Sequence, residues 1–161
     1  MPWPTWESTG NDHDRYPRPA ERLTFAIFDS DKQNVLNVEE IRIPAAFTVS
    51  EGLKYVRSNL LDVLREYAVV QAGVRVTEPN AQGMSVERIQ IEGVVQEAFA
   101  SSTVYAYYVG QISSIAARLG IKRNEFKPFT AGEKDPGVEN WSKHSSVERE
   151  AILCAMGAIN A

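Results

Sequence analysis

Acidic side chains near the ends of predicted elements are the residues best suited to chemistry in this sequence. The stretch "GVRVTE" (73–78) is typical of a strand, in which Glu78 falls on the same face as Val74 and Val76. A carboxylate on the core face of a strand, where the strand ends, could have a chemical role. The alternative interpretation is that Glu78 caps the helix that follows.

A second acidic group lies at the start of the last predicted helix, "SSVEREAILCAMGAI" (145–159). Glu150, Glu148 and His144 are polar or charged residues at this helix start, and His144 and Glu148 are four residues apart. The ordinary interpretations are a solvated glutamate favoured by the helix dipole for Glu150 and a surface histidine for His144. Ser145 and Glu148 also have capping-box spacing, which predicts where the helix begins.

Two further stretches have both a chemical and an ordinary interpretation. Asp29 ends a predicted strand, but "DSDKQN", which contains Asp29 and Asp31, is good turn chemistry by itself. The run "KRNEFKP" (122–128) combines basic and aromatic residues that could contact phosphate, although a solvated loop is the favoured interpretation.

The elements that must position these residues follow the order β-β-α-β-α-β-α-α, which predicts a mixed sheet covered by helices. An irregular, proline-rich arm (1–22) precedes one domain (23–161). The predicted strands are 23–29, 35–43, 73–78 and 103–109, and the predicted helices are 48–68, 85–100, 111–120 and 145–159, with no periodicity between 121 and 144.

The composition narrows the class of protein. The 161 residues suit one domain, and no apolar run is long enough to span a membrane. The net charge of −4 means that nucleic acid would have to bind at a local basic patch. The first residues lack a signal-peptide pattern, and the single Cys154 cannot form an internal disulfide, so we expect a cytoplasmic protein.

The arm lacks alternation, and its large anchors are Trp3, Trp6 and Tyr16. We therefore expect an interaction element rather than a core strand, docked by its tryptophans on the domain or on a protein partner.

Short patterns over roughly residues 23–160 resemble the RuvC-like Holliday-junction resolvases of the ribonuclease H-like superfamily. They are "FAIFDSDKQNVLNVEEIRIP", "VRVTEPNAQG" followed by "ERIQIEGVVQEA", "VYAYYVGQISSIAARLG" and "HSSVEREAILCAMGAI". The resemblance implies an α/β, ribonuclease H-like mixed sheet flanked by helices. Its first strand would be altered or missing here, because the proline-rich arm stands in its place.

The resemblance also implies a mechanism in which acidic residues hold two Mg²⁺ or Mn²⁺ ions for phosphodiester hydrolysis. Glu78 and Glu150 match the catalytic acids, and Glu148, His144 and Asp29 are further candidate metal ligands. The match is incomplete, since Val147 stands one turn before Glu150 and cannot ligate. The region that should carry the first aspartate offers Asp14 without a strand around it.

Two functions follow from the resemblance and both stay open at this point. The first is a metal-dependent endonuclease acting on branched DNA. The second is a catalytically degenerate member of the same fold that serves as a binding or structural module. A helix at 85–100 that contains Gly93 predicts a homodimer contact, because the resolvases that it resembles pair through this helix.

Overall fold

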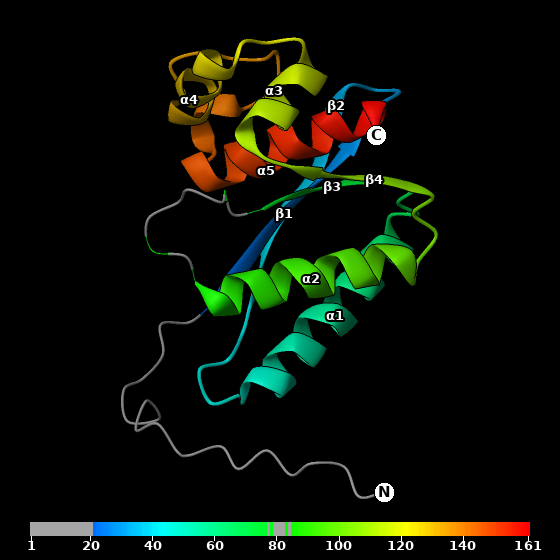
Figure 1. The fold of residues 1–161 in the computed structure, drawn as a ribbon. Helices are drawn as coiled ribbons and strands as arrows, with labels where there is room; N and C mark the ends of the chain where they lie inside the picture. Colours follow the sequence, from blue (N-terminus) through cyan, green and yellow to red (C-terminus); the bar gives the residue numbers. More distant parts are fainter. Residues whose placement is uncertain (1–20, 77, 79–82, 84) are drawn as a thin grey trace, which may run out of the picture.

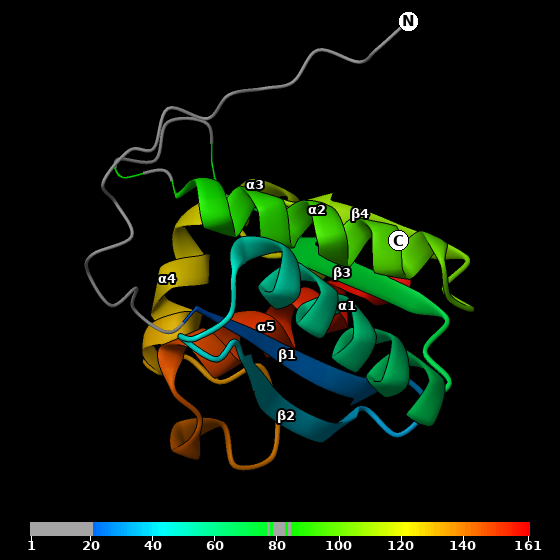
Figure 2. The same cartoon turned by 90° about the horizontal axis from the view of Figure 1, so that it is seen from below.

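The chain contains both strands and helices, and its computed structural model describes residues 21–76, 78, 83 and 85–161 (Figure 1). Three layers are visible, with α1 and α2 on one face of the strands and α5, α3 and α4 on the other (Figures 1 and 2). The elements are β1 (Arg22–Asp29), β2 (Asn34–Arg42), α1 (Val49–Glu66), β3 (Gln71–Arg75), α2 (Val86–Ala100), β4 (Ala106–Gly110), α3 (Ile112–Leu119), α4 (Arg123–Ala131) and α5 (Ser146–Gly157).

Strands β1 and β2 form an antiparallel hairpin, as their apolar and branched residues predict. The ladder shifts register between Ile27 and Phe28, which is a β-bulge. The turn is held by Asp29, whose Oδ1 accepts the backbone N–H groups of Asp31 at 3.0 Å and Lys32 at 3.1 Å. The turn interpretation of this stretch is therefore confirmed.

Strands β3 and β4 pair in parallel, with Gln71 opposite Ala106 and Arg75 opposite Gly110, and α2 connects them. Gly73 in β3 permits close packing here, because an added Cβ would lie only 2.4 Å from Cε1 of Tyr108. Tyr108 in turn donates its hydroxyl to the carbonyl of Cys154 in α5 at 2.7 Å. Glycine at this position thus lets the parallel pair lie against α5.

The hairpin and the parallel pair are separate two-stranded sheets within the described residues. One pair is antiparallel and the other is parallel, but within the described residues no ladder of hydrogen bonds joins β1 to β3 into the single mixed sheet that the sequence predicted. Instead α5 packs against both strands and bridges them from one side (Figure 2).

The core consists of two apolar clusters on the two sides of the strands. One lies under α1 and α2 and includes Val56, Leu60, Leu64, Val95 and Phe99. The other surrounds α5 and includes Ile115, Phe126, Trp141, Ile152 and Leu153. Among the described helices, none is both long and apolar enough to span a lipid bilayer.

Two of the predicted elements were wrong in a way that matters for the site. Strand β3 ends at Arg75 rather than at residue 78, so Glu78 lies beyond the strand. The stretch read as aperiodic contains α4, where Phe126 is buried and the Glu125 carboxylate accepts the backbone N–H of Lys122 at 2.8 Å. A nine-residue helix with an internal proline, Pro128, is too short to show a helical period.

Candidate carboxylate site at the end of strand β3

Arg75, the last residue of β3, lies between the two carboxylates that the sequence singles out. Its Nε is 2.8 Å from Oε1 of Glu150, and its Nη2 is 3.8 Å from Oε1 of Glu78. The Nε–H is not aligned on the carboxylate oxygen, so the contact is an ion pair rather than a well-formed hydrogen bond. Only 19% of the Arg75 side chain is exposed, so solvent screens these contacts less than it screens surface ion pairs.

Glu78 is also held by the first residues of two helices. Its Oε1 accepts the backbone N–H of Ile112 at 3.3 Å, and its Oε2 lies 3.7 Å from Nη2 of Arg123. Ile112 begins α3 and Arg123 begins α4, so the carboxylate satisfies a free N–H at the positive end of a helix dipole. The alternative interpretation that Glu78 caps a helix is therefore correct, but the helix that it caps is α3 and not α2, which follows it in the sequence.

Glu148 and His144 make their observed contacts at the N-terminus of α5 and not with Arg75. The Glu148 carboxylate accepts the backbone N–H of Ser145 at 2.6 Å, and the Ser145 hydroxyl accepts the N–H of Glu148 at 3.2 Å. The backbone hydrogen bond from Ser145 lowers the pKa of Glu148. Nδ1 of His144 lies 3.8 Å from Oε2 of Glu148. The predicted capping box is confirmed.

Asp29 makes its observed contacts inside the β1–β2 turn. Besides its two backbone hydrogen bonds, its Oδ2 lies 3.8 Å from Nζ of Lys32. Asp14 lies outside the described residues. Of the five sequence-predicted ligands, then, Glu78 and Glu150 share a common partner, whereas the observed contacts of Glu148, His144 and Asp29 are local.

The described donor set does not fit a divalent metal centre. No group of three or more His, Cys, Asp and Glu side chains that could hold a metal ion occurs in the described part of the chain. The guanidinium between Glu78 and Glu150 already supplies a positive charge, and it would repel a second cation placed there. The metal-ligand assignment stays a prediction that would require Arg75 to move away.

Arg75 is the residue of this candidate site that the sequence reasoning missed. The signal was present in "GVRV", where a basic residue interrupts an otherwise apolar strand. A charge in a half-buried strand needs an opposite charge nearby, so it could have pointed to Glu78 three residues later. Glu150 could not have been identified in this way, because it comes from a distant helix.

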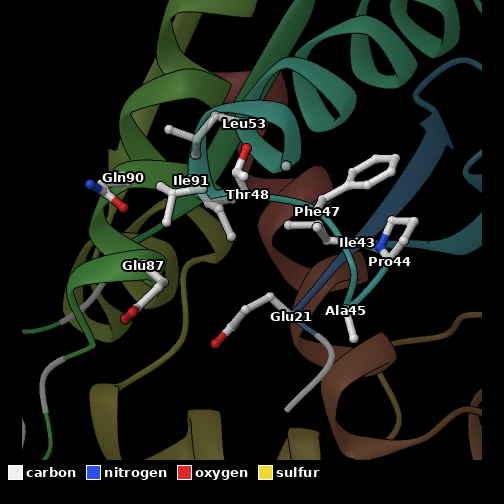
Figure 3. A pocket seen from close by; sticks show the side chains of 12 residues that line it. Glu21, Ile43, Pro44, Ala45, Phe47, Thr48, Leu53, Glu87, Gln90 and Ile91 are labelled. Carbon is white, nitrogen blue, oxygen red and sulfur yellow. The ribbon is translucent and has the colours of Figure 1, made fainter. Parts of the chain in front are cut away.

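A cleft of about 750 Å³ runs along the site, lined by all residues of β1 and β3 and by parts of α1, α2 and α5. Arg75 and Glu150 are among its lining residues. A second pocket, of about 60 Å³, is too small for a typical ligand. Figure 3 shows this small pocket with apolar Ile43, Leu53 and Ile91 around it, together with the acidic Glu21 and Glu87.

Comparison with solved structures finds the same architecture in RuvC of Thermus thermophilus. The structure titled "Thermus thermophilus RuvC structure" has a TM-score of 0.60 at 14% identity and covers 84% of each chain. The structure titled "T. thermophilus RuvC in complex with Holliday junction substrate" has a TM-score of 0.62 at 17% identity, again over 84% of each chain. No family model and no curated protein matches the sequence. The likeness shows a RuvC-like, ribonuclease H-like fold, which confirms the predicted fold class.

Proposed function

We propose that this chain is a catalytically degenerate RuvC-like module that binds branched DNA without cleaving it. The observation that carries the proposal is the position of Arg75 between Glu78 and Glu150. The guanidinium of Arg75 offsets one of the two negative charges and Arg123, 3.7 Å from Glu78, offsets the other, so the pair can be balanced without a divalent ion. Carboxylates that are paired with arginine in this way stabilise the fold and do not activate water.

The DNA-binding part of the proposal is supported by a structural neighbour and by local charge. The neighbour is RuvC bound to a Holliday junction substrate. Lys122, Arg123 and Lys127 are exposed at α4, next to the carboxylate site, and Glu78 contacts Arg123. They form the kind of local basic patch that a chain of net charge −4 requires if it is to contact phosphates.

The test is a labelled four-way DNA junction incubated with the full chain in Mg²⁺ or Mn²⁺. We expect a complex in a gel-shift assay that weakens as salt rises, no cleavage products, and no effect of EDTA on binding. Replacing both Arg123 and Lys127 by Ala should weaken binding at least several-fold. Lys54→Ala, which removes an exposed charge from α1, is the matched control and should leave binding unchanged. Absence of any complex at low salt would contradict the DNA role and leave a module that binds protein.

The second candidate is the metal-dependent endonuclease, and one observation favours it. Glu78 and Glu150 are far apart in the sequence, yet they meet at one guanidinium. Cleavage would require Arg75 to leave and a further acid, such as Asp14, to come from outside the described residues. Metal-dependent cutting by the wild-type chain that disappears in both Glu78→Gln and Glu150→Gln would establish the endonuclease and overturn the first proposal.

We also propose that the module forms a homodimer through α2. Val86 and Ile89 on this helix are 64% and 42% exposed, and no atom lies within 4 Å of the place where a Cβ of Gly93 would be. An exposed glycine between apolar residues lets a second helix approach closely. Gly93→Leu should convert a dimer to a monomer in sedimentation. The control Ser58→Leu, at an exposed position of α1, should leave the dimer intact. A wild-type monomer at tens of micromolar would end this idea.

The cytoplasmic location that the composition predicted stays a proposal as well. It rests on Cys154, which is a free buried thiol. Detection of the native protein in a cytoplasmic fraction, with a separated periplasmic or secreted fraction as control, would test it.

A further inference from the structure

The small pocket of about 60 Å³ lies where helices α1 and α2 begin, and most of the side chains that line it are apolar. Ile91 is buried, and Ile43 and Leu53 pack against the same apolar core, so these three side chains form its inner wall (Figure 3). Phe47 and Val49 also line the pocket, and they remain 37% and 38% exposed. The pocket therefore opens to solvent through an apolar rim.

Short-range contacts hold this pocket in shape without a ligand. Phe47 donates its backbone N–H to the carbonyl of Pro44 at 3.0 Å, and its ring meets the ring of Tyr55 edge-on, with the centroids 5.6 Å apart. Gly52 lets the first turn of α1 lie close to the end of the hairpin, because an added Cβ would be only 3.0 Å from Cγ2 of Ile43. A partner would therefore meet a preformed surface, and its binding would cost little ordering of this chain.

The charged side chains at this pocket are acidic. Glu21 and Glu87 are the only charged residues among the described residues that line it, and no lysine or arginine is among them. Figure 3 shows both carboxylate groups on the same side of the pocket. The Glu87 carboxylate accepts the hydroxyl of Ser85 at 3.1 Å, which holds it at the start of α2. Two negative charges beside one apolar pocket attract a cation and repel the phosphates of a nucleic acid.

We propose that this pocket is a docking site for a protein partner, and that it binds a segment in which an aliphatic side chain lies next to a lysine or an arginine. The volume suits one aliphatic side chain and is too small for a drug-sized molecule. Protein interfaces concentrate their binding free energy in single anchors of this kind, surrounded by a polar or charged rim. The cation of the segment pairs with Glu21 and Glu87, and its apolar part covers Phe47 and Val49.

The docking site is separate from the surfaces that serve the proposed function. No residue of α4 and no Gly93 occurs among the described residues that line the pocket. Residues 1–20 of the predicted interaction arm lie outside the described residues, and no part of the site is taken from them. The docking site can therefore be present when DNA binding or the homodimer fails, and it can be absent when they hold.

A nuclear magnetic resonance titration of the full chain with short capped peptides tests the proposal. The probe has the sequence AKLKA, and the two reference peptides are AKAKA, without the aliphatic anchor, and AELEA, with the opposite charge. We expect the probe to shift the amide signals of Gly52 and Ile91 saturably, with a Kd of about 1 mM. Both reference peptides should bind at least fivefold more weakly. Equal binding of the three peptides, or no saturable shift at the pocket, would overturn the proposal.

Removing the two carboxylates tests the charged part of the site. The double variant Glu21→Gln with Glu87→Gln should weaken binding of the probe at least fivefold and make it insensitive to salt. The matched control is Glu66→Gln with Glu133→Gln, which removes two exposed charges elsewhere and should leave binding unchanged. An equal loss of binding in the two double variants would overturn the proposal, because only the net charge would then matter.

Sedimentation of the same variants distinguishes a protein partner from a second copy of this chain. We expect Glu21→Gln with Glu87→Gln to leave the oligomeric state of the wild type unchanged. Conversion of a wild-type dimer to a monomer by this double variant, with the control unaffected, would overturn the proposal. The occupant of the pocket would then be a second copy of the chain.

Discussion

Nε of Arg75 lies 2.8 Å from Oε1 of Glu150, and this contact joins the end of β3 to the first turns of α5. The two residues stand 75 positions apart, the difference between their numbers, so the ion pair fixes β3 against α5 across almost half of the chain. Both side chains are partly shielded from water, with 19% and 33% exposed. Removing one partner of such a shielded pair leaves the other charge poorly compensated, which costs more than breaking a fully exposed surface pair.

Removing one member of this pair should destabilise the fold. We expect Glu150→Gln to lower the free energy of unfolding by about 1–3 kcal/mol, because Arg75 keeps only the more distant Glu78 as a partner. Urea denaturation measures the change. The double variant Arg75→Met with Glu150→Gln should cost less than the sum of the single changes. Glu133→Gln, at an exposed position, is the control, and additive single effects would argue against coupling.

The sign of the change in unfolding free energy caused by Glu78→Gln distinguishes a structural role of this glutamate from a role as metal ligand. We expect a loss of about 1–2 kcal/mol in unfolding free energy, because glutamine can still accept the Ile112 N–H but cannot pair with Arg75 or Arg123. The measurement is urea denaturation in EDTA and again in Mg²⁺. If the substitution stabilised the metal-free protein, the carboxylates would be repelling each other, and the endonuclease would be favoured.

Acid should weaken the start of α5 through Glu148. The hydrogen bond from the Ser145 backbone holds the folded pKa of this carboxyl below its ordinary value of 4.5. A lowered folded pKa means that the stabilisation is fully present above the unfolded value, and that it is lost as the pH falls through the folded value. We expect Glu148→Gln to make stability less sensitive to pH below 4.5, measured by thermal unfolding. Glu139→Gln, an exposed loop substitution, should keep the wild-type slope.

Cys154 should be inert in the native protein. Burial raises the pKa of its thiol to about 11, so very little thiolate exists at pH 8. We expect a coloured disulfide reagent to modify the native chain at least a hundredfold more slowly than the chain unfolded in guanidinium. Labelling of native protein at the unfolded rate would show that α5 opens readily or that the thiol is exposed.

Local patterns in the sequence determined the elements whose signals lie within a few residues. The capping box at Ser145 with Glu148 was predicted from spacing alone, and it is present. Helices α1, α2 and α5 follow from apolar periodicity, and the hairpin turn follows from "DSDKQN". The order of these elements, together with the short patterns that resemble the RuvC-like resolvases, predicted the fold class that the structural neighbours show.

Only the tertiary structure decided what the two central acids do. The sequence placed Glu78 and Glu150 at element ends, and it could not show that Arg75 would lie between them. It also could not show that β1 and β3 would leave a cleft instead of joining one sheet. The physical reason is the range of the interactions. Caps, turns and amphipathic faces depend on residues up to about four positions apart. An ion pair across 75 positions, or an open edge between two strands, exists only after the layers have packed.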